Sequence, residues 1–132
     1  MGEDGMTLRT LMALLAILFP TALFAHDRPG PHGGQAVDAG PYFVEAAPEP
    51  GKLRVFLYNE ETKKPESIKG AKGTATVLLG QQREVATLEA DAGEKDGNLM
   101  TGKLTLAPGP GMRIVVQLQI PGHPSIVARF AF

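Results

Sequence analysis

The sequence predicts an all-β fold: a single antiparallel β-sandwich of the immunoglobulin-like kind, with seven or eight strands, after a cleaved signal peptide. Three observations lead to this prediction. Apolar residues recur with a period of two from residue 42 onward. Turns rich in Gly and Pro separate these runs at regular spacing. Outside the N-terminal segment, no window of useful length has helical periodicity.

The first 25 residues are ordered like a secretory signal peptide. An apolar run over residues 11–19 is followed by the helix-breaking Pro20 and by a short segment that ends at Ala25. The run is shorter than the ~20 residues that span a bilayer as a helix. We therefore expect cleavage after Ala25 and a periplasmic protein with no membrane segment after cleavage, an uncleaved anchor being the alternative. Translation starts at Met1 or at Met6.

The mature chain begins with a short irregular segment. Residues 26–34 hold two prolines and three glycines, which disfavour regular structure and predict a flexible N-terminal arm. Residues 35–132 then form one β-sandwich domain, since a chain of this length supports one small core and not two. The sequence contains no cysteine, so packing and backbone pairing must stabilise the domain without disulfides.

Seven segments alternate between apolar and polar residues as strands do. In the second of them we expect Leu53, Val55 and Leu57 to face the core and Phe56 to lie on the outer face. The longest connection, residues 59–73, carries mixed charges and suits a solvated loop or a contact with a partner. The predicted strands span residues 42–46, 52–58, 74–79, 83–89, 99–106, 112–120 and 125–132.

Composition excludes several classes of function. The formal net charge is −1, so no basic excess attracts nucleic acid. Ser67 and Ser125, the only serines, lack the sequence context of an activated nucleophile, and there is no cysteine to replace them. No glycine-rich segment has the spacing of a phosphate-binding loop. We therefore expect a protein that is not an enzyme.

The histidines supply the remaining chemistry. Cleavage after Ala25 would make His26 the first residue, whose α-amine and imidazole together chelate a metal. Asp27 adds a carboxylate, and His32 follows along the arm. His123, in a predicted turn, would join them only if that turn folds near the arm. Nitrogen and oxygen donors without thiolate suit Cu(II), Ni(II) or Zn(II). Met100 and Met112 are expected to be core residues rather than ligands.

The mature chain also resembles a group of small exported β-sandwich proteins of proteobacteria. The similar elements are the His-Gly-Gly motif at residues 32–34 and segments 42–45, 53–58, 64–65, 70–71, 120–122 and 127–130. Related His-Gly-Gly segments are similar to parts of periplasmic adaptors of heavy-metal efflux pumps. The N-terminal histidine is similar to that of periplasmic copper-resistance sandwiches. These resemblances imply a copper or heavy-metal setting and a component of an efflux system as partner.

Two hypotheses follow for function. The first is a periplasmic metal-binding accessory protein in copper, zinc or nickel homeostasis or efflux. The second is an envelope protein-interaction module that needs no metal and uses a sheet edge or the loop at residues 59–73.

Overall fold

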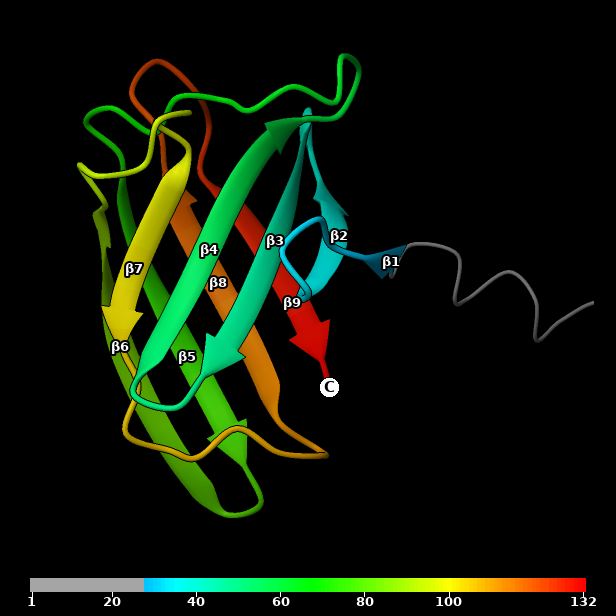
Figure 1. The fold of residues 1–132 in the computed structure, drawn as a ribbon, viewed down its shortest axis with the longest axis vertical. Helices are drawn as coiled ribbons and strands as arrows, with labels where there is room; N and C mark the ends of the chain where they lie inside the picture. The colour runs from blue at the N-terminus through cyan, green and yellow to red at the C-terminus, as the bar shows by residue number, and fades with distance from the viewer. Residues whose placement is uncertain (1–27) are drawn as a thin grey trace, which may run out of the picture.

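The computed structural model describes residues 28–132, which form nine β-strands (Figure 1). Most strands end at a glycine-containing turn, as at Gly51, Gly80 and Gly111, where a positive φ reverses the chain. The described residues contain no helix that is long and apolar enough to cross a membrane. The strands are β1 Arg28–Pro29, β2 Gln35–Ala39, β3 Tyr42–Glu49, β4 Lys52–Asn59, β5 Lys72–Leu79, β6 Gln82–Ala90, β7 Leu99–Lys103, β8 Arg113–Gln119 and β9 Ile126–Ala131.

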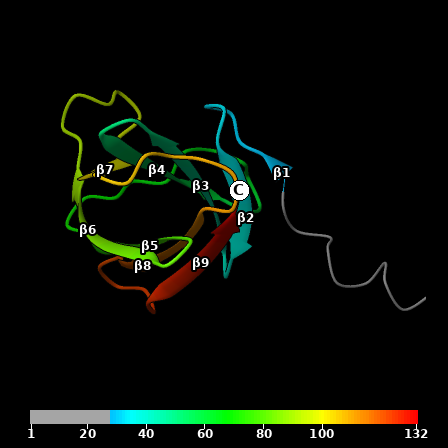
Figure 2. The same cartoon turned by 90° about the horizontal axis from the view of Figure 1, so that it is seen from below.

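All strand pairs are antiparallel, and together they make one sheet with the order β1-β2-β3-β4-β7-β6-β5-β8-β9. The sheet curls around the core, so that β2 and β9 come to lie side by side (Figure 2). The prediction of an all-β antiparallel fold is therefore confirmed.

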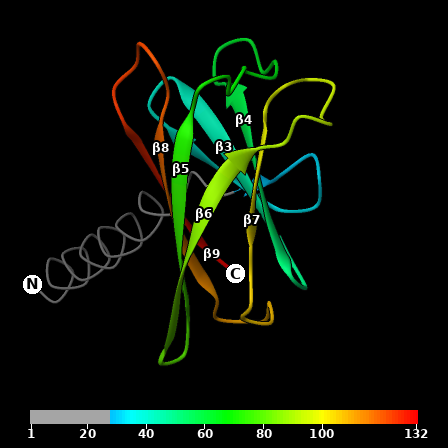
Figure 3. The ribbon, with the colours of Figure 1, turned by 90° about the vertical axis from the view of Figure 1, so that its left-hand side faces the viewer.

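The predicted division into two separate sandwich layers is not confirmed, because β6 connects the two halves. It pairs with β5 over most of its length and with β7 at its end, through Glu89 and Ala90 (Figure 3). Gly102 on β7 permits this approach, since a Cβ there would lie 2.9 Å from the Thr87 carbonyl oxygen. One continuous curled sheet results.

The main core fills the inside of the curl. Leu53, Val55 and Leu57 face inward as predicted and are at most 1% exposed. Met100 and Met112 are also buried there, so their assignment as core residues is confirmed. Burial of this apolar surface is the main favourable contribution to folding that the chain has available.

A second apolar cluster lies on the outer face of the sheet. We call it the outer cluster; it consists of Ala36, Phe43, Phe56, Tyr58 and Leu99. Phe56 does lie on the outer face, as predicted, but it is only 1% exposed. Aromatic side chains on a solvent-facing surface would be costly, so their burial requires a covering segment. The N-terminal residues of the described chain supply it.

Strands β1 and β2 were not predicted from the sequence. The segment Gln35–Ala39 contains two Ala and one Asp, which have low β propensity, so its strand character comes from pairing with β3. Residues 26–34 were predicted to be a flexible arm. In the structure the described part of that arm lies against the sheet, where Arg28 and Pro29 pair with β2.

Core packing makes a testable prediction. Val116 on β8 is fully buried, whereas Val127 on β9 is 41% exposed. Changing Val116→Ala should lower the free energy of unfolding by about 2 kcal/mol, because it removes buried methyl groups and leaves a cavity. Val127→Ala should change it by less than about 0.5 kcal/mol. Urea denaturation followed by circular dichroism measures both, and equal losses would contradict the assigned faces.

Candidate metal-binding site at His32

A tight turn between β1 and β2 positions His32. The Gly33 amide donates to the Gly30 carbonyl (3.2 Å), and the Gly30 amide donates to the Gly34 carbonyl (2.9 Å). Pro31 occupies the second position of this turn, where its fixed φ is favourable, and Gly33 has a positive φ of 83°. The turn therefore directs the third residue, His32, back over the outer face of the sheet.

The turn is held by the carboxylate of Glu45, which projects from the outer face of β3 and is completely buried. Its Oε2 accepts hydrogen bonds from the amides of His32 (2.8 Å) and Gly34 (3.0 Å), and its Oε1 lies 2.8 Å from Nδ1 of His32. A buried carboxylate is tolerated only when its oxygens are hydrogen-bonded. Three donors from one turn meet that requirement.

Glycine is needed at both ends of the turn because the backbone comes so close to β3. A Cβ at Gly30 would lie 2.2 Å from Oε2 of Glu45, and a Cβ at Gly34 would lie 2.2 Å from the carbonyl oxygen of Ala46. A side chain at Gly30 must displace the Glu45 carboxylate, and a side chain at Gly34 must displace the turn or β3. Gly30 and Gly34 thus allow the turn to come close enough for its backbone amides to reach Glu45.

The imidazole of His32 has one fixed edge and one edge toward solvent. The ring stacks on Phe56 with a centroid distance of 3.7 Å and an interplanar angle of 2°. Glu45 lies on the Nδ1 side of the ring, so in the neutral imidazole Nδ1 is the nitrogen that donates to the carboxylate and Nε2 is the one with the lone pair. The His32 side chain is 36% exposed, while Glu45 is fully covered. A histidine oriented in this way by a carboxylate has the arrangement typical of metal ligands.

Tyr58 lies next to the His32–Glu45 pair. Its hydroxyl lies 3.1 Å from Nδ1 of His32, and its ring stacks on Phe43 at a centroid distance of 4.6 Å. Burial, followed by the negative charge of Glu45, raises the pKa of Tyr58 to about 12. The phenol therefore stays protonated over the whole physiological range.

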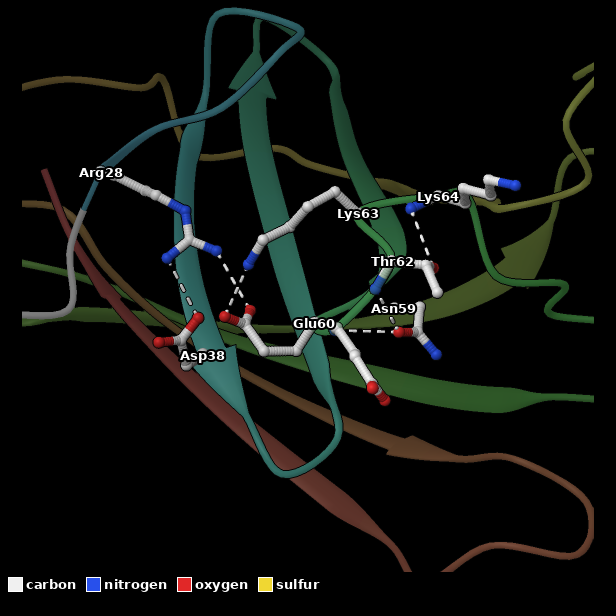
Figure 4. A network of polar contacts seen from close by, with 8 residues as sticks. Arg28, Asp38, Asn59, Glu60, Thr62, Lys63 and Lys64 are labelled. Carbon is white, nitrogen blue, oxygen red and sulfur yellow. Dashed lines mark hydrogen bonds and ion pairs between the residues drawn. The ribbon is translucent and has the colours of Figure 1, made fainter.

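A surface ion-pair network covers the other end of the outer cluster (Figure 4). Arg28 contacts Asp38 at 3.1 Å and Glu60 at 3.2 Å, and Lys63 contacts Glu60 at 2.7 Å. The Lys63 ammonium, which donates to Glu60, lowers the pKa of this carboxyl to about 2, with Arg28 adding to the effect. The Arg28 guanidinium also lies 4.8 Å from the centre of the Phe43 ring. The network joins β1 to the loop after β4.

A hollow of about 410 Å³ opens beside His32. Arg54 is the only one of its lining residues with a permanently charged side chain; the others are His32, Gly33, Ala47, Pro48, Pro108, Gly109, Pro110, Met112 and Phe132. A larger hollow of about 750 Å³ lies over β5, β6, β8 and β9 and includes none of the predicted ligands.

The four predicted metal ligands have different outcomes. His26 and Asp27 lie outside the described residues. His32 lies beside Glu45, whereas His123 lies in the turn between β8 and β9, where its ring packs edge-on against Tyr42 at 5.9 Å. Within residues 28–132, no three His, Cys, Asp or Glu side chains gather closely enough to hold a metal ion.

Glu45 is the site residue that the sequence analysis did not identify. It interrupts the apolar run Phe43, Val44, Ala46 on a strand whose outer face carries Phe43 opposite Tyr58. A carboxylate between buried neighbours was the available signal, because it must have found donors from another segment. The sequence could not show which segment supplies them.

Comparison with known proteins adds no assignment. No protein-family model matches the chain, and no curated protein or solved structure gives a significant match.

The close approach at Gly30 can be tested by substitution. Gly30→Ala should lower the free energy of unfolding by about 1–3 kcal/mol and speed amide exchange at His32 and Gly34, because the new methyl group displaces Glu45. Gly109→Ala is the matched control, since no atom lies within 4 Å of a Cβ there. Denaturation and NMR-detected hydrogen exchange measure the effects. Unchanged exchange in Gly30→Ala would contradict the described turn.

The raised pKa of Tyr58 predicts a loss of stability in alkali. Between pH 10 and pH 12 the unfolded state releases the phenol proton while the folded state retains it, so raising the pH favours unfolding. Between pH 8 and pH 11.5 the free energy of unfolding of the unmodified protein should fall by up to about 2 kcal/mol more than that of the Tyr58→Phe variant. Urea denaturation at each pH provides the comparison. Parallel pH profiles for the two proteins would refute the prediction.

Proposed function

We propose that this protein is a periplasmic, non-enzymatic metal-binding accessory protein that takes part in copper, zinc or nickel homeostasis or efflux. The observation that supports the proposal best is the Glu45–His32 pair, in which a buried carboxylate fixes the tautomer and orientation of a partly exposed imidazole. Such pairs raise the basicity of the ligating nitrogen and preset its direction.

In this proposal His32 contributes Nε2 to the metal. His26 would add its imidazole and, after cleavage following Ala25, its α-amine, and Asp27 would add a carboxylate. Imidazole, amine and carboxylate donors suit Cu(II), Ni(II) or Zn(II). The place of His123, beside Tyr42 at the end of the sheet, makes it the least suited of the four predicted ligands.

The cellular setting is part of the same proposal. Residues 1–25 are a signal peptide, and the processed chain interacts with a component of a heavy-metal efflux system. We further propose that the curled sheet behaves as an immunoglobulin-like sandwich of two layers. The short contact between β6 and β7, limited to two residue pairs, supports this view.

An envelope protein-interaction module that needs no metal is the second candidate. The loop between β4 and β5 favours it. Its residues are mostly exposed, yet Oδ1 of Asn59 accepts hydrogen bonds from the backbone amides of Glu61 and Thr62. These bonds give the loop a defined shape. A preformed exposed loop loses little entropy when it binds a partner.

Titration of the processed protein with Cu(II) or Zn(II) tests the metal proposal. His32→Ala should weaken binding at least about 10-fold. Glu45→Gln should weaken it about 10- to 100-fold. The Gln amide would donate to Nδ1 and move the proton to Nε2, which can then no longer bind a metal. Isothermal titration calorimetry gives the affinities, and circular dichroism confirms that each variant is folded.

Two controls separate the parts of the proposal. His123→Ala should bind metal as the unmodified protein does. A variant with extra residues before His26 has no free α-amine at this position. Its affinity for the metal should therefore fall if the α-amine is a ligand. Unchanged affinity in His32→Ala would overturn the site, and a partner retained in the presence of a chelator would favour the interaction module.

A further inference from the structure

The hollow beside His32 combines apolar walls with one cationic side chain. Proline, methionine and phenylalanine residues form much of its lining, and Arg54 supplies the positive charge. Arg54 extends from the outer face of β4 opposite Ala47, and its guanidinium lies 5.5 Å from the centre of the Phe56 ring. His32 stacks on that same ring, and both His32 and Arg54 line the hollow.

The hydrogen-bonding capacity of Arg54 is not used within the described chain. Its Nε is buried and has no hydrogen-bond partner among residues 28–132. The carboxylate of Glu49 lies 3.6 Å from this nitrogen, which is an ion pair but too long for a hydrogen bond. Glu49 is itself 43% exposed, so solvent weakens its hold on the guanidinium. The guanidinium therefore has no hydrogen-bonded partner among the described residues, while the Arg54 side chain as a whole is 28% exposed.

We propose that this hollow binds a small carboxylate that carries an apolar body. The carboxylate accepts two parallel hydrogen bonds from the Arg54 guanidinium, the geometry that this planar group favours. The apolar body lies against the proline residues and Phe132. The volume of about 410 Å³ falls within the range of small-molecule sites.

The lining favours this class of ligand over more highly charged anions. A phosphate or sulfate would bring two charges to a single guanidinium and would place its remaining oxygens against apolar walls, where they would lose hydration. A monocarboxylate brings one charge, and its apolar part replaces water at those walls. The proposal requires no metal, and its outcome is therefore independent of the function proposed above.

Benzoate is the probe for this site, and benzamide, its neutral isostere, is the control. With the metal-free processed protein, benzoate should shift the NMR signal of the Arg54 Nε–H group and saturate with a Kd on the order of 1 mM. Benzamide should bind at least about 10-fold more weakly, because it offers no charge to the guanidinium.

Three variants make the test specific. Arg54→Lys keeps the positive charge but removes the planar guanidinium with its paired N–H donors, and it should lose at least about 10-fold in benzoate affinity. Arg129→Lys, on the exposed face of β9, should bind as the unmodified protein does. Glu49→Gln should bind benzoate a few-fold more tightly, because the competing carboxylate is gone.

Several results would overturn the proposal. They are the absence of saturation at about 100 mM benzoate, equal binding of benzamide, and full affinity in Arg54→Lys. Circular dichroism of each variant shows whether it has folded, and a variant that does not fold is replaced by Arg54→Gln, for which the same loss is expected.

Discussion

The organisation of the outer face depends on one buried carboxylate. Glu45 stands on a β-strand at a position where its neighbours require an apolar environment, and it is fully covered. It can remain there because the turn at residues 30–34 supplies two amides and an imidazole nitrogen to its oxygens. If these donors were removed, a charge would stay in a low-dielectric environment at a cost of several kcal/mol. The carboxylate thus fixes the turn, and the turn covers the carboxylate.

The outer cluster follows from the same constraint. With His32 held over Phe56, the aromatic rings of Phe43, Phe56 and Tyr58 are removed from water on a face that would otherwise be solvated. Arg28 and its ion pairs close the cluster at the other end. The exposed ion pairs contribute little free energy individually, so the apolar burial beneath them is the larger stabilising effect. The first described residues are therefore an integral part of the fold.

The proposed chemistry uses both polar groups that the outer cluster positions. Glu45 leaves one nitrogen of His32 for a metal, and Phe56 holds the Arg54 guanidinium next to the hollow where a carboxylate would bind. Both sites lie on rigid strands or on a turn held by hydrogen bonds, which favours precise geometry.

The sequence by itself determined the class of fold and the inward face of β4 at Leu53, Val55 and Leu57, because alternation and turn residues act locally. Strand β2 was missed since its propensity is weak and its pairing with β3 decides its conformation. The continuous curl of the sheet depends on contact between β6 and β7, and the Glu45–His32 pair joins residues from separate segments. Only the tertiary structure decides such contacts, because no local pattern records which distant donor a buried carboxylate meets.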